Sequence, residues 1–271
     1  MSDEERHGTR RMGRVSEEEE EGQLSYGSYL RLDEVLDAQT LLSDPAAHDE
    51  LLFIVVHQAY ELWFKQMLFE LESIRDLMLA GDVPRARHFL SRVHAIGRLM
   101  REQIHVLETM DPQDFLEFRS NLDPASGFQS VQFREIEALS GIDDPRYAKL
   151  VVPEDRPRVL RRMEEPDLWD AFRDLLQGHG LPMPQDDAEA RRTSLLKLAR
   201  DRDAHPELWR LAEDLLVHDQ LFALWRQHHV TMVERQIGSK TGTGGSAGVS
   251  YLRETLDRRF YPELWAVRND L

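Results

Sequence analysis

Three long stretches of this chain carry apolar residues at intervals of three and four positions, and that spacing limits the fold more than any other feature. They cover residues 50–80, 82–108 and 205–238. Apolar side chains at this spacing lie on one face of an α-helix. Gly81 is typical of a helix end and Pro84 of a first helical turn, which predicts a short connection between the first two stretches. Long helices with short connections favour a bundle whose interior can hold a ligand or cofactor.

The rest of the chain predicts the same class of structure. Shorter helical segments are expected at residues 112–119, 124–140, 157–177 and 187–202. No stretch shows sustained two-residue alternation, and the strand-like run Leu150–Val152 is short. We therefore expect an all-α fold with one helical domain over residues 23–271. Residues 1–22 are polar and charged, which predicts a disordered acidic tail.

Composition excludes several kinds of protein. The chain has no cysteine, so it can form no disulfide, thiolate metal site or covalently attached c-type haem. Its formal net charge of −16 argues against a nucleic-acid partner. The longest uncharged apolar stretch, Leu51–Tyr60, is far shorter than the roughly 18 residues of a membrane span. The charged start, Asp3–Glu5, offers no apolar core for an export signal. We expect a cytoplasmic protein without membrane contact.

Two of the 11 histidines lie on apolar helix faces. His57 shares a face with Phe53 and Phe64, at offsets of four and seven residues. His229 shares a face with Trp225, whereas its neighbour His228 points about 100° away on a helix. Each histidine could be a functional group or a packing residue. No pair has the spacing His-Glu-x-x-His, so a zinc hydrolase is poorly supported.

An arginine and a glycine-rich segment are the remaining candidates for ligand binding. Arg119 lies next to Phe115 and Phe118, a setting that suits capture of a ligand carboxylate, although a surface ion pair is the alternative. Residues 238–248 hold five glycines and do not form a phosphate-binding loop. They could be a flexible linker or a lid over a polar ligand. Together these features suggest a bundle that holds a flat aromatic ligand with a carboxylate beside a histidine-bound group.

Four strings of residues carry a resemblance to a known family over about residues 24–270. They are Tyr26–Leu30, His57–Lys65, Leu107–Ser130 and Trp225–Gly245. In order and spacing they resemble the tryptophan 2,3-dioxygenases, haem enzymes that open the indole ring of L-tryptophan. The resemblance implies that L-tryptophan and O2 give N-formyl-L-kynurenine, the first step of tryptophan catabolism by the kynurenine pathway.

The resemblance also assigns residues to roles. It implies that His229 is the proximal ligand of a noncovalent haem b iron, one per subunit, with Ser126 and Gly127 also at the cofactor. His57 would be the distal catalytic residue, accepting a hydrogen bond from the indole N–H. The substrate-binding residues would be Arg119 and Thr243 at the carboxylate, Phe53, Phe115 and Leu122 around the indole ring, and Tyr26, Tyr29 and Leu30. The last three would come from a neighbouring subunit of a homotetramer, whose N-terminal segment completes the pocket.

Two alternatives remain open at this point. One is a related haem enzyme that oxygenates another indole or a substituted tryptophan. The other, from a different class, is a non-catalytic helical interaction protein whose histidines are packing residues.

Overall fold

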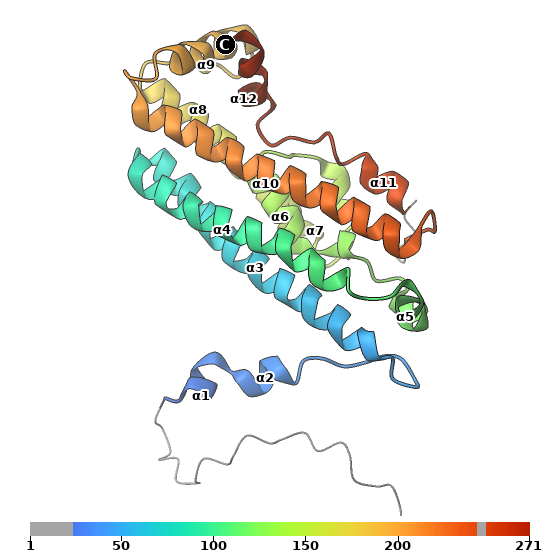
Figure 1. The fold of residues 1–271 in the computed structure, drawn as a ribbon. Helices are drawn as coiled ribbons and strands as arrows, with labels where there is room; N and C mark the ends of the chain where they lie inside the picture. Colours follow the sequence, from blue (N-terminus) through green and yellow to red (C-terminus); the bar gives the residue numbers. More distant parts are fainter. Residues whose placement is uncertain (1–23, 243–247) are drawn as a thin grey trace, which may run out of the picture. The chain divides into compact units, whose positions relative to one another are not determined.

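The computed structural model describes residues 24–242 and 248–271, and the chain divides after Thr40 into two compact units. The expected tail, residues 1–22, lies outside the described residues. The first unit holds two short helices, α1 (Tyr26–Leu30) and α2 (Leu32–Leu36) (Figure 1). Ser25 begins α1 with a reciprocal capping box to Ser28, which satisfies amide groups that the short helix leaves free.

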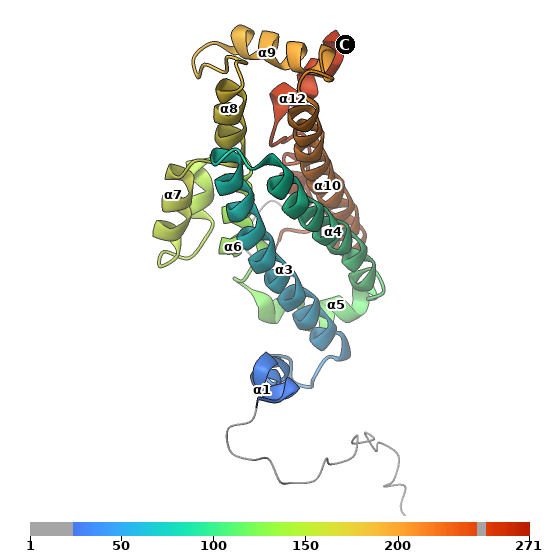
Figure 2. The ribbon, with the colours of Figure 1, turned by 90° about the vertical axis from the view of Figure 1, so that its left-hand side faces the viewer.

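The second unit is built on three long helices, α3 (His48–Leu79), α4 (Val83–Leu107) and α10 (Pro206–Ile237). Helix α4 packs along both α3 and α10, and Figure 2 shows the three running side by side. Their bounds lie within two residues of the predicted ones. Because the described residues contain helices and no strand, the all-α prediction is confirmed. Nor does any described helix combine the length and the apolar character that crossing a bilayer requires.

The connection between α3 and α4 follows the predicted signals. Gly81 adopts φ 77°, a left-handed conformation that glycine reaches without strain. Asp82 is the N-cap of α4, and its carboxylate accepts a hydrogen bond from the Arg85 amide at 3.2 Å. Pro84 occupies the first turn of the helix, where its missing N–H is not needed. A short turn therefore reverses the chain and places α3 against α4.

The cap gives a stability prediction. Asp82→Ala removes an acceptor for a helix-terminal N–H and should lower the free energy of unfolding by about 1 kcal/mol. Denaturant unfolding followed by circular dichroism measures the change. Asp82→Asn, which keeps the side-chain acceptor, is the control and should stay close to the unchanged protein. Equal losses of unfolding free energy in both variants would show that the cap hydrogen bond does not account for the loss.

Two of the shorter predicted segments are interrupted. The segment 157–177 forms α7 (Arg156–Glu164) and α8 (Leu168–Gly178), because Pro166 breaks the run and Asp167 caps the second helix. Within 124–140, a single 3₁₀ turn (Gly127–Gln129) precedes α6 (Val131–Leu139). The other elements are α5 (Pro112–Phe118), α9 (Ala188–Arg200), α11 (Val249–Arg253), α12 (Pro262–Val267) and the 3₁₀ turns Arg119–Leu122, Pro145–Lys149 and Arg268–Asp270.

Buried charges connect α10 to its neighbours. Glu137 of α6 accepts hydrogen bonds from Arg134 at 2.5 Å and from Arg226 of α10 at 3.0 Å, and all three side chains are buried. A buried carboxylate is tolerated only when it is paired in this way. The arrangement fixes the position of α10 one turn before His229.

A second buried carboxylate connects α10 to the segment that contains α12. Asp219 accepts hydrogen bonds from the amides of Phe260 and Tyr261 and from the Trp265 indole, at 3.0, 3.2 and 2.8 Å. Its side chain has no exposed surface. All three donors reach Oδ2 and offset part of the carboxylate's loss of water, whereas Oδ1 is buried without a hydrogen-bond partner.

Candidate functional site

His57 lies in α3 and holds a defined tautomer. Its Nδ1 is 2.7 Å from the backbone carbonyl oxygen of Phe53, which can only accept a hydrogen bond, so Nδ1 carries the proton. Burial by surrounding protein lowers the pKa of His57, although the Phe53 carbonyl and the Glu61 charge oppose that shift. The neutral ring therefore keeps an acceptor lone pair on Nε2. By surface area, His57 is nevertheless an exposed residue.

Aromatic side chains from α3 and α5 gather beside His57. The Phe53 ring centroid lies 4.0 Å from that of His57 and 5.8 Å from the stacked ring of Phe115. Phe118 is fully buried beneath them and meets Phe53 and Phe115 edge-on. Leu122 packs on the same cluster. The structure thus brings together His57 and the three predicted indole contacts, Phe53, Phe115 and Leu122.

His229 lies in α10, and its ring stacks on the indole of Trp225. The two centroids are 5.4 Å apart with an interplanar angle of 10°. Burial, together with the charges of the nearby His57 and His228, lowers the pKa of His229 to about 4. The imidazole is therefore neutral at pH 7, the state in which a ring nitrogen can bind a metal ion. His229 is half-buried, whereas His57 is exposed.

Arg119 follows α5 and reaches the glycine-rich segment. One guanidinium nitrogen donates a hydrogen bond to the carbonyl oxygen of Thr241. Gly248 adopts φ 64°, and a Cβ there would collide with the carbonyl oxygen of Lys240, so the two ends of the segment meet at a position that only glycine can fill. Thr243 lies outside the described residues, and its predicted contact with the substrate stays a prediction.

The remaining predicted residues lie in two places. Ser126 caps the 3₁₀ turn by accepting a hydrogen bond from Phe128 at 3.4 Å, and a Cβ added at Gly127 would meet open space. The Phe128 ring meets Tyr251 of α11 edge-on at 5.0 Å, which connects this turn to the helix after the glycine-rich segment. In the first unit, the predicted contacts all lie on α1 with exposed side chains: Tyr26, Tyr29 and Leu30. Their roles stay predictions.

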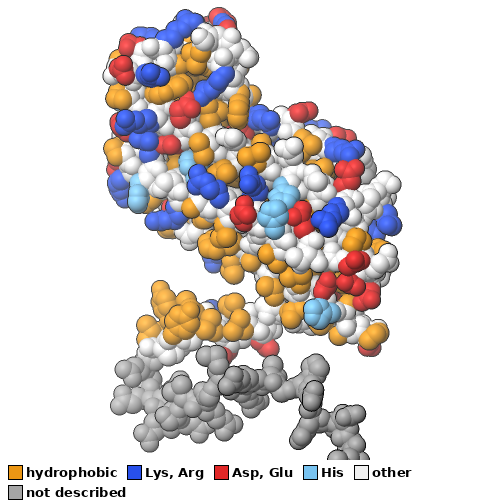
Figure 3. All heavy atoms as spheres, viewed as in Figure 1, with side chains coloured by type: hydrophobic (Ala, Val, Ile, Leu, Met, Phe, Trp, Pro, Cys, Tyr) orange, Lys and Arg blue, Asp and Glu red, His pale blue; other side chains and the backbone are white. Residues whose placement is uncertain are grey.

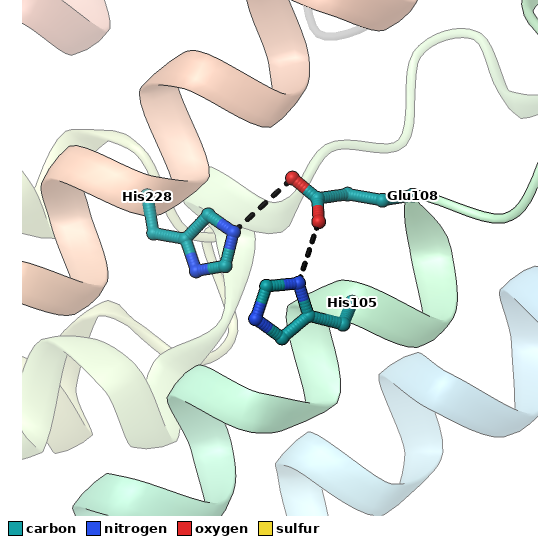
Figure 4. A group of neighbouring side chains, drawn as sticks. All are labelled: His105, Glu108 and His228. Atoms are coloured by element: carbon teal, nitrogen blue, oxygen red, sulfur yellow. Dashed lines mark hydrogen bonds and ion pairs between the residues drawn. The ribbon is translucent and has the colours of Figure 1, made fainter.

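One group of ionisable side chains was not predicted from the sequence: His105, Glu108 and His228 (Figure 4). The three-residue interval between His105 and Glu108 was a visible signal, because such residues are neighbours on a helix. His228 is 120 residues from Glu108 along the chain, so only the packing of α10 on α4 reveals that they meet.

Sequence comparisons identify relatives over most of the chain. The profile of a family described as Tryptophan 2,3-dioxygenase matches residues 12–171 and 187–271. A protein of Nocardioides sp. named tryptophan 2,3-dioxygenase is 54% identical over 264 residues, covering 95% of this chain and 98% of the relative. Proteins of the same name from Herpetosiphon aurantiacus and Serratia proteamaculans are 44% and 43% identical, over 92% of this chain and 98% and 93% of their own lengths. The matched ranges include every residue assigned to the site.

Proposed function

This chain belongs to the tryptophan 2,3-dioxygenase family and is a dioxygenase that acts on tryptophan; we propose that the reaction takes place between His57 and His229. L-tryptophan and O2 give N-formyl-L-kynurenine by opening of the indole C2–C3 bond, the first step of tryptophan catabolism. The observation that carries the proposed site is the pair of neutral imidazoles on α3 and α10, one of them beside an aromatic cluster.

The residues present fit a noncovalent haem b. His229 offers a neutral ring nitrogen on a half-buried residue, and the cysteine-free chain offers no thiolate to compete for the iron. His229 would hold the iron, with Ser126 and Gly127 at the edge of the cofactor. The haem, when bound, supplies the redox-active iron that activates O2. The protein contributes binding, orientation and exclusion of water.

The substrate is held at both ends. The Arg119 guanidinium binds the carboxylate of L-tryptophan as a two-pronged donor, and Thr243 contacts the same end. Phe53, Phe115 and Leu122 enclose the indole ring. His57 accepts the indole N–H at Nε2, which orients the ring; an indole N–H is too weak an acid for this neutral imidazole to act as an obvious base.

We also assign the enzyme to the cytoplasm as a homotetramer. The apolar side chains of α1 support subunit association, because Tyr26 and Tyr29 are 77% and 71% exposed within one chain. In the tetramer, Tyr26, Tyr29 and Leu30 would complete the site of a neighbouring subunit.

Substrate preference tests the proposal. We expect the highest kcat/KM for L-tryptophan, lower values for ring-methylated tryptophans, and little turnover of free indole, which lacks the group that Arg119 binds. The ultraviolet absorbance of N-formyl-L-kynurenine reports product, and protein without haem is the blank. Preference for indole would favour instead a haem enzyme that oxygenates another indole.

A further inference from the structure

Three potential metal-binding side chains meet where α4 ends beside α10. The Glu108 carboxylate lies between two imidazoles, with Oε2 2.7 Å from His105 Nδ1 and Oε1 3.1 Å from His228 Nε2. One ligand atom from each of the three residues lies within 4.8 Å of the other two. Figure 4 shows both rings turned toward the carboxylate, His105 and Glu108 from α4 and His228 from α10.

The local fold explains why these three side chains lie close together. His105 lies in the last turn of α4, and Glu108 is the C-cap residue three positions later, so both point to the same side. His228 precedes His229 on α10 and points about 100° away from it, toward α4 instead of the proposed haem side. The side chains of Glu108 and His228 are about one-fifth exposed and that of His105 is 57% exposed. An ion can reach the group from solvent while most of its ligands remain sheltered.

We propose that His105, Glu108 and His228 bind a divalent transition-metal cation of the zinc type, with water as the fourth ligand. Two imidazoles and one carboxylate are a zinc ligand set, whereas calcium and magnesium prefer oxygen ligands alone. Bonds of about 2.0–2.2 Å in a tetrahedron place ligand atoms roughly 3.3 Å apart. The two imidazole nitrogens lie 2.7 and 3.1 Å from different oxygens of Glu108, and the three ligand atoms lie within 4.8 Å of one another, so rotation of these side chains must bring the ligands to that spacing.

An outer carboxylate supports the assignment. Glu102 Oε2 lies 4.0 Å from His105 Nε2, on the side of the ring opposite the nitrogen that faces Glu108. Metal-binding histidines usually donate their second N–H to such a group, which fixes the tautomer and orientation of the ring. Glu102, whose side chain is 61% exposed, can do this after moving closer than the present 4.0 Å, when Nδ1 binds the metal.

The competing explanation is a hydrogen-bonded cluster without a metal. In that case Glu108 accepts a hydrogen bond from each imidazole and stabilises the end of α4. A metal would replace these two protons and hold α4 and α10 together beside His229. The proposal concerns a face other than the haem site and does not depend on the proposed function.

Zinc binding to the full, haem-loaded protein tests the proposal. The protein is dialysed against a range of Zn²⁺ concentrations, and zinc and iron are counted by atomic emission. We expect one zinc per chain in the unchanged protein, and an affinity reduced about tenfold or more in His105→Ala and in Glu108→Gln. His88→Ala, an exposed histidine on the same helix, is the matched control and should keep the affinity.

Thermal unfolding provides the second measurement. Zn²⁺ should raise Tm in the unchanged protein and in His88→Ala, and should leave Tm unchanged in His105→Ala and Glu108→Gln. Iron content should be equal in all four proteins. Absence of zinc from the unchanged protein would overturn the proposal, and so would equal zinc affinity in the unchanged protein and the two cluster variants.

Discussion

His229→Ala is expected to yield protein without the Soret absorption of bound haem and without measurable dioxygenase activity. The substitution removes the neutral imidazole that we assign to the iron, and the cysteine-free chain supplies no thiolate in its place. Absorbance spectra after haem supply, together with iron content and product formation, measure the effect. Added imidazole, which can enter the space left by the side chain, should restore part of the Soret band.

His228→Ala is the matched control for this variant. It removes the adjacent imidazole, which points toward Glu108, and should keep the Soret band and the iron content. An unchanged Soret band in His229→Ala would place the iron ligand on another residue. Loss of the band in both variants alike would show that this part of α10 is generally sensitive to substitution.

Arg119→Ala should raise KM for L-tryptophan by about tenfold to 150-fold, with a smaller change in kcat. Loss of a charge-assisted pair to a carboxylate corresponds to about 1.5–3 kcal/mol of binding free energy. The bond from Arg119 to the Thr241 carbonyl does not prevent this role, because a guanidinium has five N–H donors and the carbonyl uses one nitrogen. Steady-state kinetics of product formation measure KM and kcat separately.

Two further arginine variants sharpen the test. Arg119→Lys keeps the charge but loses the two-pronged geometry, so its KM should lie between those of the unchanged enzyme and Arg119→Ala. Arg146→Ala removes an exposed arginine paired with Asp144 and should leave KM unchanged. An unchanged KM in Arg119→Ala would mean that another group binds the carboxylate.

The long helices could be predicted from the sequence because their signals are local. Apolar spacing, Gly81 and the first-turn prolines act within a few residues, and the bounds of α3, α4 and α10 followed from them. The break between α7 and α8 was also local, since Pro166 interrupts a segment that is otherwise typical of a helix. It was missed because the helical spacing continues on both sides.

The site was predictable only in part, because only some of its contacts are made between residues close together in the sequence. His57 and Phe53 share a face of one helix, so their contact follows from helical geometry. The bond between Arg119 and Thr241 joins residues 122 positions apart, and periodicity carries no information about such a meeting. The family resemblance pointed to Arg119 but did not indicate its hydrogen bond to the Thr241 carbonyl oxygen. Neither helical spacing nor the family resemblance indicates the contact between His228 and Glu108. Only the packing of α10 against α4 reveals it.

The buried Asp219 also bears on how the protein is made. Its three donors belong to residues 260–265, which leave the ribosome only after the whole of α10 has been synthesised. Until then, this carboxylate must stay in water, because burying it without partners is too costly. The middle of α10 therefore reaches its final packing late in synthesis. The nascent chain must keep this part of the bundle open until Phe260 and Trp265 arrive.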